Sequence, residues 1–120
     1  MADAVPMSGM PLPAVSIVVP VKNEAGNIGP LVTEIAAALA GRNFEIIVVD
    51  DGSRDETPAQ LAEMMKTEPH LRVIRHTVAC GQSAAVRSGV SAARAPVVAT
   101  LDGDGQNNPS FIPALIDPFT

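Results

Sequence analysis

The sequence predicts an α/β fold in which a parallel β-sheet carries helices on both faces. Short apolar, partly β-branched segments alternate along the 120 residues with segments whose apolar residues recur at helical spacing. Such alternation favours right-handed crossovers and therefore a parallel sheet. Polar clusters follow three of the strands, where ligands of such sheets bind. We expect the strand order 3-2-1-4, which places the clusters after the first and fourth strands beside one crevice.

The first half of the chain contains two predicted strand–helix units. The first strand covers 15–19 and is expected to end at Pro20, because proline has no N–H for a β-ladder. A helix follows from Ile28 and stops near Gly41. The second strand covers 44–49, and its helix opens at 57–58 and runs to about 66.

The second half repeats the alternation with weaker signals. A third strand is expected over 71–74, and the turn 80–82 leads into a helix with an apolar side. The fourth strand, at 97–101, is a short continuous apolar run and predicts a strand that is fully buried. Pro109 begins a last helical segment.

The composition excludes several classes of protein. The 47% of apolar residues is enough for a core, and the formal charge of −5 leaves no basic surface for nucleic acid. Cys80 is the only cysteine, so a disulfide framework is excluded and a reducing, cytoplasmic location is expected. No apolar run approaches the ~18 residues needed to span a bilayer. We expect a flexible tail over 1–13 and one folded part over 14–120.

Two carboxylates follow the fourth strand directly. Asp102 and Asp104 stand two residues apart, so on an extended chain their side chains point the same way. Paired oxygen ligands at the mouth of a strand suit Mg²⁺ or Mn²⁺. Gln106 repeats the spacing and offers an amide oxygen. An EF-hand is excluded because Pro113 stands where the bidentate glutamate belongs, and because a strand precedes the acids.

The remaining polar residues divide into candidates for the site and residues with ordinary roles. Asp51 is favoured as a ligand-binding residue and Asp50 as a structural one, since Ser53 or Asp55 can cap the next helix. Glu24 is a further candidate. Surface or solvated positions are expected for the other residues considered: His70, His76, Arg75, Arg87 and Arg94. Cys80 is interpreted as a small turn residue, because the sequence suggests no histidine partner for a nucleophile.

Four motifs in this order resemble family 2 glycosyltransferases. They are VVPVKNE at 18–24, IVVDDGSRDET at 47–57, GQSAA at 81–85 with Gly89, and LDGDGQNNP at 101–109. The resemblance begins near Val15 and is strongest to the branch that moves a sugar from a nucleotide onto a polyprenyl or dolichyl phosphate. It implies the GT-A fold, with a Rossmann-like sheet, and a GDP- or UDP-sugar as donor.

The resemblance also implies roles for individual residues. Pro20, Lys22 and Glu24 would line the base and ribose pocket, and Asp51 would contact the nucleoside. Asp102, followed by Gly103, would contact the ribose or sugar. Asp104 would hold the Mn²⁺ or Mg²⁺ ion with help from Gln106. The ion neutralises the diphosphate and stabilises the leaving group.

Catalytic domains of that family are substantially longer than 120 residues. The resemblance therefore implies the donor-binding half of an enzyme of cell-envelope glycan synthesis, with no catalytic base assigned and with little activity of its own. The acceptor would be a polyprenyl phosphate at the cytoplasmic face of the membrane, with membrane association through the acceptor or through a C-terminal part. The fourth strand would be a sheet edge, which predicts dimerisation through it.

Three alternatives stay open from the sequence alone. The first is a nucleotide-binding fragment without catalysis. The second is a receiver-type phosphoacceptor module, which would need an acid pair after the first strand and a late lysine, both absent here. The third is a nucleotidyltransferase, which usually has a glycine-rich, basic loop after the first strand. Gly26 and Gly29 match such a loop poorly.

Overall fold

The computed structural model describes residues 12–103 and 108–119 and contains a four-stranded parallel sheet. The strand order is β3-β2-β1-β4, which confirms the predicted α/β class and sheet order. The elements in chain order are β1 (Val15–Val21), α1 (Ile28–Ala38), β2 (Phe44–Asp51), α2 (Thr57–Met65), β3 (Leu71–His76), α3 (Gln82–Ala92), β4 (Val97–Thr100), η2 (Pro109–Phe111), α4 (Ile112–Ile116) and η3 (Asp117–Phe119). Apart from 12 and 13, the expected tail lies outside the described residues.

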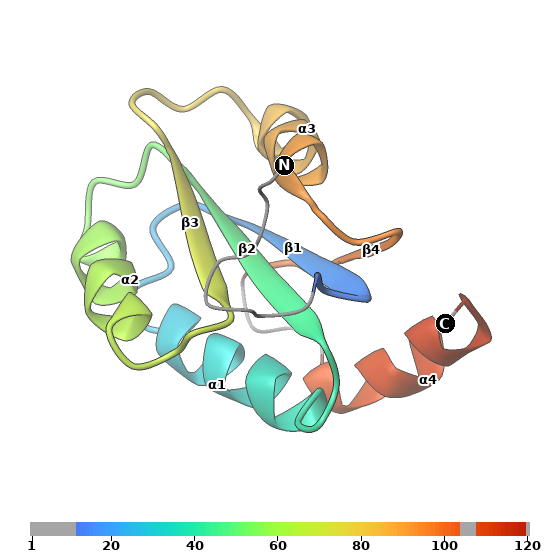
Figure 1. The fold of residues 1–120 in the computed structure, drawn as a ribbon. Coiled ribbons are helices and arrows are strands. Elements are labelled where there is room, and N and C mark those ends of the chain that lie inside the picture. The colour runs from blue at the N-terminus through green and yellow to red at the C-terminus, as the bar shows by residue number, and fades with distance from the viewer. Residues whose placement is uncertain (1–11, 104–107, 120) are drawn as a thin grey trace.

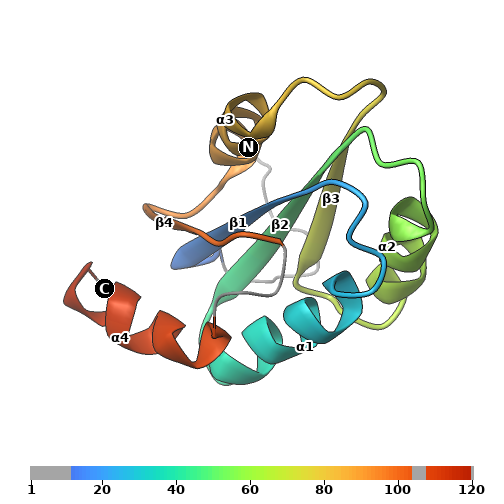
Figure 2. The ribbon, with the colours of Figure 1, turned by 180° about the vertical axis from the view of Figure 1, so that it is seen from behind.

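Helices cover the two faces of the sheet unequally. Helices α1, α2 and α4 lie on one face and α3 alone lies on the other (Figures 1 and 2). Successive side chains of a strand point to opposite faces, so Ile17 and Val19 join the large core against α1, and Val18 joins a smaller core with Ala85 of α3. Among the described residues, no helix has the length and apolar character that crossing a membrane requires.

β1 continues through Pro20 to Val21, so the prediction that the strand ends at Pro20 was wrong. The carbonyl oxygen of Val18 accepts the N–H of Leu101 on the β4 side. Backbone groups alternate in direction with a period of two, so Pro20 also faces the β4 side, beyond the end of β4 at Thr100. The missing N–H of the proline therefore breaks no bond of the sheet.

β2 and β3 are also each two residues longer than predicted. β2 includes Asp50 and Asp51, which lie opposite Arg75 and His76 in β3. Polar side chains in the two strands lie side by side there, so the change from apolar to polar residues does not mark the strand ends.

β4 is half-buried, so the prediction of a fully buried strand was wrong. Its residues alternate between partly buried and exposed, and Val98 is 37% exposed. Among the described residues β4 pairs only with β1 and forms the edge of the sheet. The exposed residues Val98 and Thr100 lie beside Ser16 and Val18, on the face where α3 packs mainly over β1 and β2.

A buried carboxylate fastens the end of α3 to the sheet. Glu45 of β2 is 2% exposed and accepts hydrogen bonds from Ser16 Oγ (2.5 Å), the backbone N–H of Arg94 (2.8 Å) and Arg94 Nε (3.0 Å). Arg72 Nη1 also donates to Glu45 Oε1 (2.8 Å) and to the carbonyl oxygen of Ala92 (3.0 Å). Burial raises the pKa of the Glu45 carboxyl, but these hydrogen bonds outweigh it and hold the pKa below its usual value.

Two of the residues expected in solvent have specific partners instead. Arg94 forms the ion pair with Glu45 just described. The ring of His70 stacks on Phe44 with centroids 4.0 Å apart, and its Nδ1 lies 2.8 Å from Glu68 Oε2. Glu45 and Phe44 are far from Arg94 and His70 along the chain, so the local sequence does not show these two contacts, whereas Glu68 is a local partner of His70.

Candidate functional site

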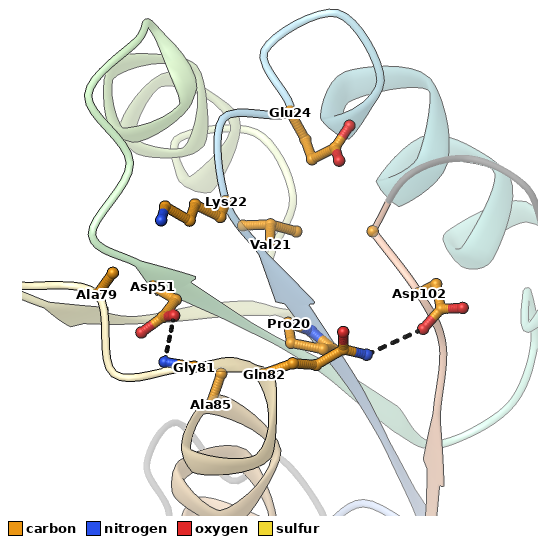
Figure 3. Close-up of a pocket in the computed structure, with 11 residues that line it drawn as sticks. Pro20, Val21, Lys22, Glu24, Asp51, Ala79, Gly81, Gln82, Ala85 and Asp102 are labelled. Carbon is orange, nitrogen blue, oxygen red and sulfur yellow. Dashed lines mark hydrogen bonds between the residues drawn. The ribbon is translucent and has the colours of Figure 1, made fainter.

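A cavity of about 410 Å³ opens at the carboxyl edge of the sheet, where the ends of β1, β2 and β4 meet the start of α3 (Figure 3). Six of the residues proposed from the sequence line it, and Figure 3 labels all of them except Gly103 around the cavity. They are Pro20, Lys22, Glu24, Asp51, Asp102 and Gly103. Asp104 and Gln106 lie outside the described residues.

The loop after β1 is held in place by the loop after β2. The backbone N–H groups of three successive residues, 23 to 25, donate to side-chain oxygens: Asn23 to Ser53 (2.8 Å), Glu24 to Thr57 (3.0 Å) and Ala25 to Asp55 (3.2 Å). Asn23 returns a bond by accepting the N–H of Arg54 (2.8 Å). The polar motif after β2 thus positions the segment from which Lys22 and Glu24 reach the cavity.

Asp50 has the structural role predicted for it. Its side chain is fully buried, and its Oδ1 accepts the backbone N–H of Ser53 at 3.0 Å. The guanidinium of Arg75 lies 3.9 Å from the other oxygen and is more than half exposed. Asp50 therefore shapes the turn after β2, while the next residue faces the cavity.

Asp51 lines the cavity and also anchors the loop before α3. Its Oδ1 accepts the backbone N–H of Cys80 (2.8 Å) and lies 2.8 Å from His76 Nδ1, and its Oδ2 accepts the N–H of Gly81 (2.9 Å). Burial raises the pKa of this carboxyl, but the bonds from Cys80, His76 and Gly81 outweigh it and hold the pKa below its usual value. Asp51 is therefore an ionised, firmly held acid.

Gly52 allows the same loop to approach β2 closely. Its φ is +73°, and a Cβ at this position would lie 2.6 Å from the backbone nitrogen of Ala79. Only glycine meets both conditions without strain. The Asp-Gly pair at 51–52 therefore determines where the loop passes the cavity.

The start of α3 supplies lining residues that were not proposed from the sequence. These residues are Ala79, Gly81, Gln82 and Ala85. Gln82 Nε2 donates to Asp102 Oδ1 at 3.3 Å (Figure 3). The GQSAA motif was the available signal, but its position beside the other motifs depends on the fold. The N-terminus of a helix carries partial positive charge, which favours an anionic ligand here.

A close contact explains why a glycine stands between Asp102 and Asp104, in the Asp-Gly-Asp (DGD) motif. Gly103 is buried, and a Cβ there would lie 2.4 Å from Val21 Cγ1 and 2.7 Å from the carbonyl oxygen of Pro20. The chain after β4 therefore passes directly over the end of β1. This contact keeps Asp102 at the rim of the cavity opposite Asp51.

The lining residues also suit a bound cation. The described lining contains three carboxylates, those of Glu24, Asp51 and Asp102, and one lysine, Lys22. This excess of negative charge would repel an anionic ligand unless a cation lay between the ligand and the carboxylates. Carboxylate oxygens are the ligands that Mg²⁺ and Mn²⁺ prefer. The negative charge of this lining thus favours a divalent ion in the cavity, and the assignment of the ion to Asp104 and Gln106 stays a prediction.

His76 was expected at the surface, and the structure corrects this. Its side chain is only 16% exposed and lies between Asp51 and Ser88, with Nε2 2.9 Å from Ser88 Oγ. The residue faces Asp51 because it lies opposite that residue in the β2–β3 register. Sequence spacing alone does not reveal the register of two strands.

Comparison with known proteins agrees with this geometry. The family model Glycosyl transferase family 2 matches residues 16–120. The dodecaprenyl-phosphate galacturonate synthase of Rhizobium johnstonii is 40% identical over 104 residues, covering 84% of this chain and 31% of that protein. The dolichol-phosphate mannosyltransferase of Pyrococcus furiosus is 41% identical over 103 residues, covering 86% of this chain and 29% of that protein. The chain thus spans about a third of these relatives.

Solved structures show the same fold. A mannosyltransferase from Pyrobaculum calidifontis, in complex with GDP-Man and Mn²⁺, matches with a TM-score of 0.70 and 28% identity over 78% of this chain and 28% of that one. Glucosyl-3-phosphoglycerate synthase from Mycobacterium tuberculosis matches in fold with a TM-score of 0.71 at 24% identity, over 89% of this chain and 39% of that one.

Proposed function

The chain belongs to glycosyl transferase family 2, and from this premise we propose that it binds the nucleotide-diphosphate sugar of a transferase that uses a polyprenyl phosphate acceptor. The observation that carries the proposal is the convergence of three strand ends and the start of α3 on one cavity. Loops that only face solvent would not be expected to place three acids around one cavity: Glu24 from the segment after β1, Asp51 from the end of β2 and Asp102 from the segment after β4.

The lining suggests how the donor is divided over the cavity. We assign the base and ribose to Pro20, Lys22, Glu24 and Asp51, which come from the ends of β1 and β2. Asp102, on the opposite rim, is assigned to the ribose or sugar. Between these walls α3 begins, and its N-terminus favours the negative charge of a diphosphate.

A divalent ion completes the proposed site. Asp104 would hold Mn²⁺ or Mg²⁺ with Gln106, next to Asp102 and Gly103. When bound, the ion neutralises the diphosphate and stabilises the departing nucleotide. The described residues contribute the acidic rim that attracts the ion, and Lys22 offers the only positive side chain in the described lining.

The names of the relatives support the choice of acceptor. Both curated relatives above are named for transfer to a polyprenyl or dolichyl phosphate carrier. We propose the same class of acceptor, GDP or UDP as the nucleotide of the donor, and a location at the cytoplasmic face of the membrane. We assign residues 14–120 to donor binding and place the acceptor site and the catalytic base outside this chain, which would then bind nucleotide without completing transfer.

The edge strand supports a proposal about self-association. β4 offers one side of its backbone without a strand partner among the described residues, and Val98 is 37% exposed beside it. Exposed apolar edges pair readily with a second chain. We propose that the chain dimerises through β4, and sedimentation velocity over a range of concentrations tests this. A monomer at all concentrations would exclude it.

Titration calorimetry with UDP and GDP tests donor binding. The chain is titrated with each nucleotide in Mn²⁺, and then again after chelation of the metal. We expect binding of one nucleotide in Mn²⁺ and its loss after chelation, and Asp102→Asn should weaken it. Absence of heat for both nucleotides in a sample shown to be folded by circular dichroism would overturn the proposal.

A further inference from the structure

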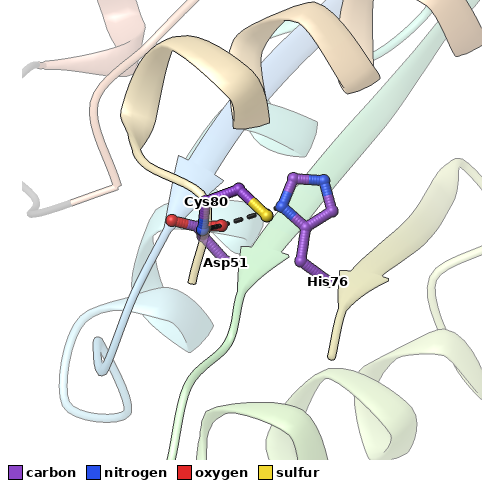
Figure 4. Close-up of side chains that lie close together, drawn as sticks. All are labelled: Asp51, His76 and Cys80. Atoms are coloured by element: carbon purple, nitrogen blue, oxygen red, sulfur yellow. Dashed lines mark hydrogen bonds and ion pairs between the residues drawn. The ribbon is translucent and has the colours of Figure 1, made fainter. Parts of the chain in front are cut away.

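Three side chains with metal-binding atoms lie together beside the cavity (Figure 4). Asp51 ends β2, His76 ends β3, and Cys80 lies in the loop before α3. A carboxylate oxygen, the imidazole nitrogen and the thiol sulfur all lie within 4.8 Å of one another. We propose that these three residues bind a divalent ion of the Zn²⁺ class, at a site distinct from the oxygen ligands of the DGD motif.

The types of donor atom select the ion. Thiolate and imidazole favour Zn²⁺ and related borderline metals, whereas Mg²⁺ and Mn²⁺ prefer oxygen. Tetrahedral Zn²⁺, with bonds of about 2.0–2.3 Å, separates neighbouring ligand atoms by roughly 3.3–3.8 Å. To reach that range, the 2.8 Å distance between Asp51 Oδ1 and His76 Nδ1 must open, which rotation of these side chains provides. A water molecule completes the four ligands.

The surroundings already fit the requirements of such ligands. A histidine that binds metal through Nδ1 must carry its proton on Nε2 and donate it to a fixed acceptor. Ser88 Oγ lies 2.9 Å from Nε2 of His76 and can accept a hydrogen bond from its N–H. The backbone N–H groups of Cys80 and Gly81 orient Asp51 at 2.8 and 2.9 Å. Cys80 is exposed, so an ion from solvent can reach the sulfur.

Binding has a defined proton balance. Cys80 now donates its thiol hydrogen to the carbonyl oxygen of Val78 at 3.3 Å, so the thiol must lose a proton to form the sulfur–metal bond. In the complex the imidazole binds through Nδ1 and carries its proton on Nε2. Each ion bound therefore releases the thiol proton to the buffer.

Titration of the 120-residue chain with Co²⁺ and then Zn²⁺, in the absence of nucleotide and Mn²⁺, tests the proposal. Co²⁺ is the probe because a thiolate ligand produces a charge-transfer absorption band, and the chain has no tryptophan or tyrosine to obscure it. We expect one equivalent of Co²⁺ to produce the band, Zn²⁺ to displace the Co²⁺ and remove the band, and calorimetry in two buffers to show release of the thiol proton.

Three variants and a control test the roles of Cys80, His76 and Ser88. Cys80→Ser should abolish the band, and His76→Gln should lose most of the affinity. Ser88→Ala should weaken binding about 10- to 100-fold, as expected for a residue that orients a ligand. His70→Gln changes the other histidine, which contacts Glu68 and Phe44, and should bind normally.

Two results would overturn the inference in samples shown to be folded. One is the absence of a band in the unmodified chain. The other is an affinity for Co²⁺ that is unchanged in His76→Gln, since Cys80 would then bind the ion without His76. Because no nucleotide is present, failure here leaves the donor-binding proposal untouched, and the reverse is also true.

Discussion

Replacing Asp51 with asparagine separates the charge of this residue from its shape. The carboxylate accepts three bonds, from Cys80, His76 and Gly81. An asparagine that keeps its oxygen toward Cys80 must turn its NH₂ group toward the N–H of Gly81, so one bond becomes a contact between two donors. The other bonds lose their charge assistance.

The expected cost follows from that count. A hydrogen bond to a charged group contributes about 1.5–3 kcal/mol. Since Asp51 borders an open cavity that admits water, we take the lower end and expect a loss of about 1.5 kcal/mol in the free energy of unfolding. A shift of the 79–81 loop should also weaken nucleotide binding about tenfold, which corresponds to about 1.4 kcal/mol.

Urea unfolding followed by far-ultraviolet circular dichroism measures the stability, and calorimetry with UDP or GDP in Mn²⁺ measures the affinity. Glu63→Gln is the matched control, because it removes one negative charge at an exposed ion pair with Lys66 in which both side chains are more than two-thirds exposed. Such surface pairs contribute little, so the control should behave as the unmodified chain.

The pH dependence supplies a second, independent check. The pKa of Asp51 is lower in the folded chain than its reference value of 3.8, so its contribution is present above about pH 4. This contribution disappears as the pH falls below 3.8 through the folded pKa. Asp51→Asn should therefore differ from the unmodified chain most at neutral pH. Equal stability and equal nucleotide affinity at pH 7 would refute the assigned role of Asp51.

Three further predictions concern two glycines that lie against valine side chains and the buried carboxylate of Glu45. Gly103→Ala should lower the free energy of unfolding by about 1–3 kcal/mol and weaken nucleotide binding, because its Cβ would lie 2.4 Å from Val21 Cγ1. Unchanged urea unfolding and unchanged nucleotide affinity would contradict this. Gly89→Ala should be similarly destabilising, because its Cβ would lie 2.4 Å from Val18 Cγ1. Gly29→Ala in α1 is the control, since its Cβ would meet nothing within 4 Å and the variant should be neutral or slightly stabilising. Equal melting temperatures of the two variants would count against the close packing of α3. Glu45→Gln should lower the free energy of unfolding by about 2–3 kcal/mol at pH 7. This is less than the ~3–5 kcal/mol of a fully buried broken ion pair, because Arg72 and Arg94 are partly exposed. Since the folded pKa of Glu45 lies below 4.5, this difference should shrink as the pH falls below that value, and a difference independent of pH would exclude the charge as its source.

The comparison of sequence and structure shows which features depended on local patterns. Runs of β-branched residues and helical spacing predicted each strand and helix, because these patterns reflect burial on one or two faces. The strand ends were less accurate. Pro20 remains within β1 because its missing N–H faces a side without a strand partner, a fact that depends on where β4 stops.

The sequence by itself determined the class of the fold, the strand order and the grouping of Lys22, Glu24, Asp51 and Asp102 at one edge of the sheet. It could do so because the carboxyl ends of parallel strands share an edge, so polar residues that follow different strands must meet there. Only the tertiary structure decided that His76 faces Asp51, that α3 begins at the cavity and that Gly103 lies against Val21. These contacts depend on strand register and on the path of loops, which are set by packing between distant segments and leave no periodic trace in the chain.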